Sequence, residues 1–251
     1  MTTPAFRLDG RVALVTGTST GLGERFARVL DAAGAAVVLA ARRAEPNAAL
    51  AAELRDALPI TCDVRTEKDR AALVAAALDH YGRIDVLVNN AGIAGSAPAE
   101  DENLDTVRDL LDTNTVGLFA LTQLVGRHML DRGSGSIVNI ASPSATISLD
   151  RYPLAGYAAS KAAVVGLTRE LAAQWAGRGV RVNALSPCFF PSNTTGWLTD
   201  PDQVAWISNR APIGRPPRPD ELDGPLLFLA SDASSYITGH NLIVDGGWTT
   251  R

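Results

Sequence analysis

Two residues one helical turn apart carry the clearest chemical signal in this sequence. Tyr157 and Lys161 stand at positions i and i+4, so a helix would place both side chains on one face. A phenol with a pKa of about 10 is a slow proton donor and acceptor at neutral pH. A neighbouring ammonium favours the phenolate and lowers that pKa. We therefore predict an acid-base group at Tyr157, with its pKa lowered by Lys161.

Two further polar residues complete the predicted catalytic set. Ser142 follows the apolar run 136–141, so its hydroxyl would project beyond the end of a strand and donate to a substrate oxygen. Asn114 lies within the long helical stretch Asn103–Leu130, where asparagine has poor helix propensity. That cost favours a functional role, and we predict that Asn114 orders a water that leads the proton to solvent.

A glycine-rich turn lies between the first predicted strand, Val12–Thr16, and the helix that follows. Here Gly17 permits a sharp bend, Gly21 leaves room for a pyrophosphate and Gly23 lets the helix pack closely. The amide groups of a helix N-terminus favour phosphate. The sequence predicts a dinucleotide site here, a purely structural turn being the alternative, with contacts from Gly17, Thr18, Ser19, Thr20, Gly21, Leu22 and Gly23.

The end of the second predicted strand indicates which dinucleotide binds. An NAD enzyme normally places a carboxylate there for the ribose 2′-hydroxyl, and Ala41 offers none. Arg42, beside Arg43, would pair with a 2′-phosphate, although both could be solvated charges. We predict NADP(H) in preference to NAD(H). Asp63, just past the third strand, would contact the adenine amino group or cap the helix near Thr66. The other predicted cofactor contacts are Val64, Asn90, Ala91 and Gly92.

Short apolar runs alternate with helical patterns along the chain, which favours a doubly wound, mostly parallel α/β sheet in one domain, 1–251. Segment 189–217 breaks the pattern and is predicted to be an irregular substrate lid, in which Phe189, Phe190, Trp197, Leu198 and Trp206 suggest an apolar pocket. The predicted strands are Val12–Thr16, Ala36–Ala40, Pro59–Cys62, Ile84–Asn89, Ser136–Ala141, Val180–Ser186 and Asn241–Val244. The predicted helices include Leu22–Ala33, Ala48–Ala57, Glu67–His80 and Pro219–Ala230.

Composition excludes several classes of protein. The 251 residues carry a net charge of -4 without a run of Lys or Arg, so nucleic acid and anionic membranes are not expected partners. The 2 cysteines and 3 histidines are scattered, which argues against a disulfide framework and a metal site. The sequence shows neither a signal peptide nor an apolar stretch of about 20 residues, so we expect a cytoplasmic protein.

Taken together, these motifs resemble the classical short-chain dehydrogenase/reductase family over essentially the whole chain. The resemblance rests on Thr16-Gly17-xxx-Gly21-x-Gly23, Asn89-Asn90-Ala91-Gly92, Ser142 and Tyr157-xxx-Lys161. It implies a seven-stranded Rossmann-type sheet with helices on both faces and a metal-free tetrad of Asn114, Ser142, Tyr157 and Lys161. It also implies hydride transfer between a nicotinamide cofactor and the carbonyl or secondary alcohol of a small organic substrate.

The sequence departs from the family pattern after the sixth strand. Pro187-Cys188 replaces the usual Pro-Gly, which restricts the backbone and places a thiol near the nicotinamide. Ser192 aligns with the threonine that holds the carboxamide, so Pro187 and Ser192 join the expected cofactor contacts. The gap between Ser142 and Tyr157 is slightly longer than in the family, which makes Ser144 the alternative to Ser142. A dinucleotide sensor without turnover is an alternative function, and a 3-oxoacyl thioester is an alternative substrate.

The helical stretch Asn103–Leu130 is apolar around much of its circumference. The helix after Tyr157 carries small residues that would let another helix approach closely: Ala158, Ala159, Ala162 and Ala163. We therefore expect a homo-oligomer, a dimer or, as the resemblance implies, a tetramer.

Overall fold

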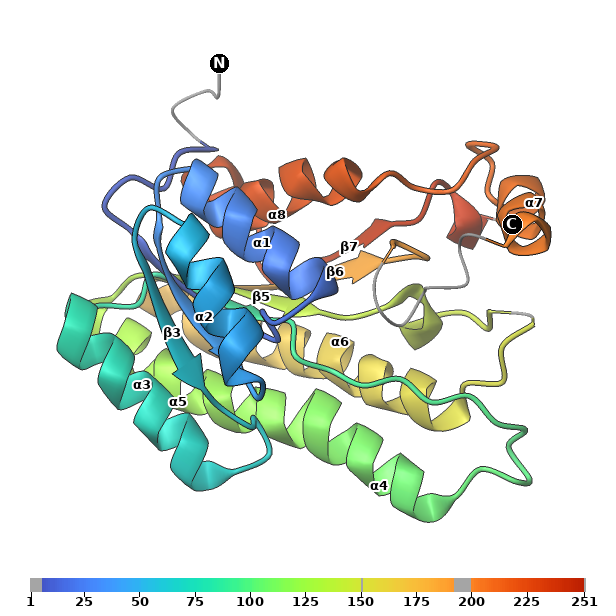
Figure 1. The fold of residues 1–251 in the computed structure, drawn as a ribbon, viewed down its shortest axis with the longest axis horizontal. Coiled ribbons are helices and arrows are strands. Elements are labelled where there is room, and N and C mark those ends of the chain that lie inside the picture. The colour runs from blue at the N-terminus through green and yellow to red at the C-terminus, as the bar shows by residue number, and fades with distance from the viewer. Residues whose placement is uncertain (1–5, 150, 192–199, 251) are drawn as a thin grey trace.

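A single parallel sheet of seven strands forms the centre of the molecule (Figure 1). The computed structural model describes residues 6–149, 151–191 and 200–250. The strand order is β3-β2-β1-β4-β5-β6-β7, which confirms the predicted doubly wound α/β fold. The strands are β1 Val12–Thr16, β2 Ala36–Ala41, β3 Ala57–Thr61, β4 Val86–Asn89, β5 Gly135–Ile140, β6 Val180–Pro187 and β7 Asn241–Val244.

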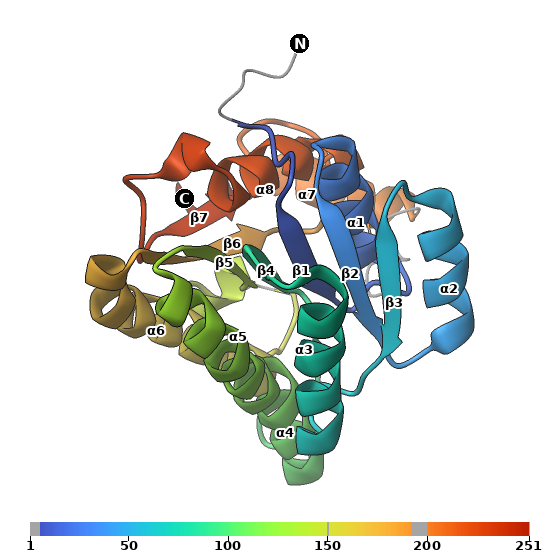
Figure 2. The same ribbon diagram turned by 90° about the vertical axis from the view of Figure 1, so that its left-hand side faces the viewer.

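Helices cover both faces of the sheet (Figure 2). On one face lie α1 (Gly21–Ala32), α2 (Ala44–Glu53) and α8 (Asp223–Ala230), which follows a 3₁₀ turn at Pro219–Leu222; on the other lie α3 (Glu67–Tyr81), α5 (Leu118–Arg132) and α6 (Ala155–Trp175), with α4 (Leu104–Leu111) before α5. Each layer buries its own apolar core against the strands: Phe26 and Leu30 on the first face, Leu121 and Met129 on the second, all fully buried. Because both faces are covered, the central strands are apolar on both sides.

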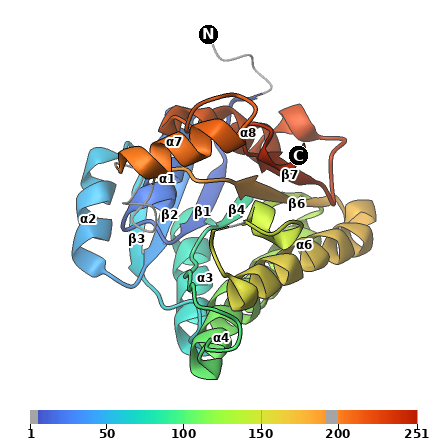
Figure 3. The ribbon, with the colours of Figure 1, turned by 90° about the vertical axis from the view of Figure 1, so that its right-hand side faces the viewer.

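The strand order reverses between β1 and β4. From β1 the chain winds outward to β2 and β3, then crosses back to β4 and continues to β7. Crossovers that diverge in this way leave a crevice outside the carboxyl ends of the strands, where open α/β sheets bind their ligands. Figure 3 looks onto this end of the molecule, where α4 and α6 begin.

Two predicted helices differ from the observed ones. The helix predicted at Ala48–Ala57 begins at Ala44 and ends at Glu53, and Ala57 already pairs with Val37 in the β2–β3 ladder. Strand pairing therefore overrides the helix propensity of the alanines. The stretch Asn103–Leu130 contains a π-helix, Asp112–Gly117, between α4 and α5.

The predicted lid, 189–217, is less irregular than expected. It holds a ten-residue helix, α7 (Pro201–Arg210), which the sequence analysis missed. Asp200 caps α7 by accepting a hydrogen bond from the Asp202 amide, and Pro201 occupies the first turn, where proline costs no hydrogen bond. Residues 192–199 lie outside the described part of the chain, and with them the predicted contacts Ser192, Trp197 and Leu198.

Candidate active site

The glycine turn joins β1 to the N-terminus of α1. Gly17 and Gly21 have φ angles of +75° and +65°, which side-chain-bearing residues adopt only at a cost. A Cβ on Gly23 would lie 2.1 Å from the Gly17 carbonyl oxygen, so only glycine lets the helix start this close to the turn. The helix begins at Gly21, and its first amides therefore face the crevice as an anion site.

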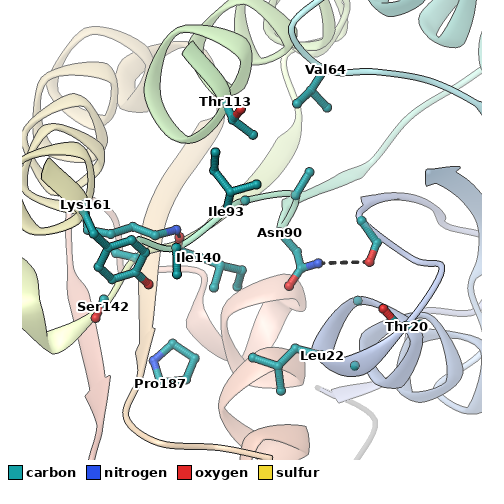
Figure 4. Close-up of a pocket in the computed structure, with 18 of the residues that line it drawn as sticks. Thr20, Leu22, Val64, Asn90, Ile93, Thr113, Ile140, Ser142, Lys161 and Pro187 are labelled. Carbon is teal, nitrogen blue, oxygen red and sulfur yellow. Dashed lines mark hydrogen bonds between the residues drawn. The ribbon is translucent and has the colours of Figure 1, made fainter. Parts of the chain in front are cut away.

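The chain after β4 holds the turn in place. The Thr16 hydroxyl oxygen accepts hydrogen bonds from the amides of Asn90 (3.0 Å) and Ala91 (2.9 Å). In return the Asn90 side chain donates to the Thr16 carbonyl at 2.8 Å. Figure 4 shows Asn90 between Thr20 and Leu22 at one end of the pocket and Ser142 and Lys161 at the other. Asn90 thus fixes the turn as well as lining the cavity.

The Thr18 side chain lies away from the cavity. Its hydroxyl is fully buried, donates to Asn47 Oδ1 at 2.5 Å and lies outside the cavity lining. Asn47 in turn donates to the Leu39 carbonyl at 2.8 Å. The pair ties the glycine turn to β2 and α2, so the Thr18 side chain supports the turn rather than contacting a cofactor. Asn47 was not anticipated, because one polar residue in an alanine-rich helix gives no signal.

Two arginines stand at the end of β2, and their surroundings differ. Arg43 donates to the hydroxyls of Ser19 (3.0 Å) and Thr20 (3.1 Å), so it is anchored to the glycine turn. Arg42 is exposed and lines the cavity, and within the described residues it makes no hydrogen bond or ion pair. Arg42 is therefore a cation available to a ligand.

Asp63 lines the same end of the cavity but does not cap α3. Thr66 is the N-cap residue and makes no side-chain bond, whereas the Asp63 carboxylate accepts from the amide of Arg65 (3.0 Å) and from its guanidinium (2.8 Å). That guanidinium holds the pKa of Asp63 below its usual value. Arg65, which also lines the cavity, is a residue that sequence reasoning missed.

Ser142, Tyr157 and Lys161 meet at the other end of the cavity, which encloses about 890 Å³. Lys161 is buried, and its Nζ donates to the carbonyl of Ile140, the last residue of β5, at 2.8 Å. The same nitrogen lies 5.8 Å from the centroid of the Tyr157 ring. The predicted pair therefore shares one helix face and one cavity with the serine.

The effect of this setting on Tyr157 is opposite to the predicted one. Burial raises the pKa of Tyr157 above its usual value, and the group that opposes this rise is the hydrogen-bonding Ser142 hydroxyl rather than Lys161. Burial also lowers the pKa of Lys161 to about 8, because the cavity wall replaces water around the ammonium. At neutral pH the phenol is protonated and the lysine is mostly charged.

The side chain of Asn114 is used for support. Its Nδ2 donates to the carbonyl of Ile93 (2.9 Å) and to the hydroxyl of Ser160 (3.0 Å), while its Oδ1 accepts from the Ile93 amide (2.9 Å). Asn114 is fully buried and is not among the residues that line the cavity. Its side-chain amide clamps the chain after β4 against α6, the helix of Tyr157, and the ordered water stays a prediction.

Aromatic side chains surround the end of the cavity that holds Tyr157. Phe189 packs on Trp206 and Trp248 with ring centroids 5.4 and 4.9 Å apart, and Tyr152 lies 5.6 Å from Trp206. Cys188 is buried in the cavity wall, which raises the pKa of its thiol. A restricted backbone was expected at Pro187-Cys188. The unusual backbone angle belongs to the next residue, Phe189, which has a φ angle of +54°.

Among residues 6–149, 151–191 and 200–250 no three His, Cys, Asp or Glu side chains gather as metal ligands. Within the same ranges no helix is both long and apolar enough to cross a membrane.

Comparison with known proteins identifies the family. A family model described as enoyl-(acyl carrier protein) reductase matches residues 17–249. The chain superposes on a short-chain type dehydrogenase/reductase from Mycobacterium marinum with a TM-score of 0.93 and 38% identity, covering 98% of both chains. The chain thus belongs to the short-chain dehydrogenase/reductase family.

Particular relatives narrow the chemistry. D-threitol dehydrogenase of Mycolicibacterium smegmatis is 43% identical to this chain, covering 98% of it and 95% of the relative. A gluconate 5-dehydrogenase from Burkholderia cenocepacia, solved in complex with NADP and tartrate, is 40% identical with a TM-score of 0.93 and 98% coverage of both chains. The chain is accordingly an NAD(P)-dependent oxidoreductase that transfers a hydride between a nicotinamide cofactor and the carbonyl or alcohol of a small organic substrate.

The lowered pKa of Lys161 makes the stability of the ligand-free protein depend on pH. Between pH 8 and 10.5 the folded protein has lost a proton that the unfolded chain keeps, so stability rises with pH. Cys62 and Cys188, whose pKa values burial raises from 9.0, oppose this rise above pH 9. From pH 8 to 9 we expect the unfolding free energy of the wild type to rise by about 1 kcal/mol relative to Lys161→Met, measured by urea denaturation. Parallel pH profiles for the two proteins would contradict the assigned pKa.

Proposed function

We propose that this protein interconverts an uncharged polyol and its ketone, with NADP(H) as the preferred cofactor and Tyr157 as the acid-base group. The observation that carries the proposal is the convergence of Tyr157, Ser142 and Lys161 on one wall of a cavity that continues to the glycine turn. A dinucleotide sensor without turnover has no use for a buried phenol, a hydroxyl and an ammonium grouped in this way.

The cavity suits a dinucleotide. At one end it offers the amides of the glycine turn and the unpaired cation Arg42, and at the other a small residue, Gly92, beside Lys161. A Cβ on Gly92 would approach Asn114 Oδ1 to 3.1 Å and Lys161 Nζ to 3.6 Å, so glycine keeps this wall open. The bound nicotinamide would supply or accept the hydride. NADP(H) is favoured because Ala41 stands where an NAD enzyme has its carboxylate.

The side chains of the protein perform the proton chemistry. In the direction of reduction, Tyr157 donates its proton to the developing alkoxide on the substrate; in oxidation it takes that proton back. The Ser142 hydroxyl donates a hydrogen bond to the same oxygen. The Lys161 ammonium stabilises the phenolate that Tyr157 becomes, and Asn114 holds α6 so that these groups stay in register.

The charge of the cavity favours a neutral substrate. Apart from Lys161, the charged residues in its lining are Arg42, Arg43, Asp63 and Arg65, which all stand at the adenosine end, after β2 and β3. Around Tyr157 the described lining is mostly aromatic and aliphatic. Lys161, the one cation at this end of the described lining, already donates to the Ile140 carbonyl, so a buried carboxylate would have no other charged partner there, which is costly. This observation favours threitol-like polyols over sugar acids and acyl thioesters.

A substrate panel tests the proposal. We expect kcat/KM for four- to six-carbon polyols to exceed that for the matching aldonates at least tenfold with NADP as the oxidant. Arg151 lies outside the described lining, and its guanidinium stacks on Trp206 at 5.2 Å from the ring centroid. Arg151→Gln is therefore the control, and it should leave the ratio unchanged. Equal turnover of acids and polyols, or a ratio that depends on Arg151, would reject the neutral-substrate assignment.

We also propose that the protein is a homo-oligomer, a dimer or tetramer. Among the described residues only four large apolar side chains are exposed, and two of them, Leu104 (67%) and Val116 (56%), lie on α4 and the adjacent π-helix. Burying this face against a second copy would remove both from water.

A further inference from the structure

We propose that Ser144 is a positioning residue that fixes the Ser142 hydroxyl as a hydrogen-bond donor pointing into the active site. The proposal rests on the proposed function, because it concerns how the serine beside Tyr157 acts. It is independent of which substrate the protein uses.

The two serines are joined by a tight turn after β5. Residues Pro143–Ala145 form a 3₁₀ turn, and Ser142 is its N-cap with extended backbone. The Ser142 Oγ accepts a hydrogen bond from the Ser144 amide at 3.2 Å, and the Ser144 hydroxyl lies 2.9 Å from the same oxygen. Both residues are only 6% exposed. Ser142 lines the cavity and Ser144 does not, which favours Ser142 over its alternative as the residue that meets the substrate.

The direction of the bond between the two hydroxyls follows from their other partners. Within the described residues the Ser144 hydroxyl oxygen has no hydrogen-bond partner except Ser142. If its proton pointed elsewhere, a buried donor would be left unsatisfied, at a cost of about 1–3 kcal/mol. Ser142 has a second neighbour in the wall of the same cavity, the Tyr157 phenol, and the Ser142 hydroxyl opposes the rise that burial causes in the pKa of that phenol. The arrangement that satisfies every group runs from Ser144 to Ser142 to Tyr157.

This arrangement uses all the acceptor capacity of Ser142. A hydroxyl has one proton and two lone pairs, and here the Ser144 amide and hydroxyl occupy both lone pairs. The Ser142 oxygen therefore cannot accept the Tyr157 proton, and its own single proton is free to be donated. Without substrate it is donated to the Tyr157 oxygen, which favours the phenolate in the complex with NADP⁺; with substrate bound it is donated to the substrate oxygen.

Ser144→Ala tests this role because it frees one lone pair on Ser142 and leaves the backbone amide bond intact. Ser142 can then accept the proton of Tyr157, which stabilises the phenol and raises its pKa. We expect the Tyr157 pKa in the complex with NADP⁺ to rise by about one unit, followed by NMR of tyrosine labelled with ¹³C at Cζ and assigned with Tyr157→Phe. The pH profile of kcat for alcohol oxidation should shift upwards equally, with kcat about tenfold lower at neutral pH and KM for NADP⁺ unchanged.

Matched variants separate this role from a general loosening of the turn. Thr146→Val removes another hydroxyl of the same turn, which donates to the Pro143 carbonyl at 3.0 Å, and should leave the Tyr157 pKa unchanged. Ser144→Thr keeps the hydroxyl and should restore the wild-type pKa. If Ser144→Ala fails to fold in a thermal melt, Ser144→Cys, a weak donor of similar size, should raise the pKa in the same direction.

An unchanged Tyr157 pKa in Ser144→Ala, or an equal rise in Thr146→Val, would overturn the proposal. Either result would leave the proposed function standing, because that function is tested separately by the substrate panel and by the turnover of Tyr157→Phe.

Discussion

Replacing Tyr157 by phenylalanine is expected to lower kcat by roughly 10²–10⁴-fold in both reaction directions. The variant loses one oxygen atom, and with it the proton that a carbonyl oxygen must gain when it is reduced. Ser142 still donates its hydrogen bond, and Lys161 keeps its bond to the Ile140 carbonyl at 2.8 Å. Transient kinetics with saturating cofactor would measure the chemical step directly.

Cofactor binding should survive this change, because the glycine turn and the arginines lie at the opposite end of the cavity from Tyr157. The Kd for NADPH, measured by fluorescence titration, is expected to change less than about threefold. Tyr152→Phe is the matched control: Tyr152 lines the same cavity, but its hydroxyl donates to Gln203 at 3.0 Å. If Tyr157→Phe kept wild-type turnover, or if Tyr152→Phe lost as much, the assigned proton donor would be wrong.

The approximate positions of the strands and their parallel arrangement were predictable because they depend on local patterns. Strands apolar on both faces, alternating with helical patterns, predicted the parallel sheet, and β1 and β7 match their predicted bounds. The glycine turn was equally predictable, since the backbone geometry within a few residues requires glycine at Gly17, Gly21 and Gly23. Signals of this kind need no knowledge of distant contacts.

Contacts between residues far apart in the chain could not be predicted from the sequence. Thr18 stands in the middle of the glycine turn, yet its hydroxyl binds Asn47, which is 29 residues away. The poor helix propensity of Asn114 correctly marked an unusual position, but its partners Ile93 and Ser160 come from two other segments. The signal therefore indicated that the residue is used, without indicating what it holds.

The direction of the Tyr157 pKa shift could not be predicted from the sequence for a related reason. The i,i+4 spacing correctly placed Lys161 beside the ring, at 5.8 Å from Nζ to its centroid. The sequence contains no measure of how deeply that pair is buried, and burial raises the pKa of the phenol while lowering that of the ammonium. Spacing predicts proximity, whereas the direction of a pKa shift depends on what surrounds the pair.

Arg42→Ala is expected to raise KM for NADPH about tenfold while changing KM for NADH less than twofold. A 2′-phosphate carries the only charge that distinguishes the two cofactors, and Arg42 is the cation in the described lining that has no hydrogen bond or ion pair. Because Arg42 is exposed, water and salt screen the contact, which places the effect near the lower end of the roughly 10–100-fold range for charged hydrogen bonds. The preference for NADPH over NADH, measured as the ratio of the two kcat/KM values, should therefore shrink as ionic strength increases.

Arg65→Ala is the appropriate comparison, since Arg65 lines the same end of the cavity with its guanidinium bound to Asp63 at 2.8 Å. Removing it frees an acid as well as a cation, so the preference for NADPH should fall only slightly. Equal losses for NADPH and NADH in Arg42→Ala would mean that the arginine attracts both cofactors as a general positive charge. In that case the preference would have to come from Arg43 and its hydroxyl partners on the glycine turn, because the buried methyl of Ala41 offers a polar contact to neither ribose.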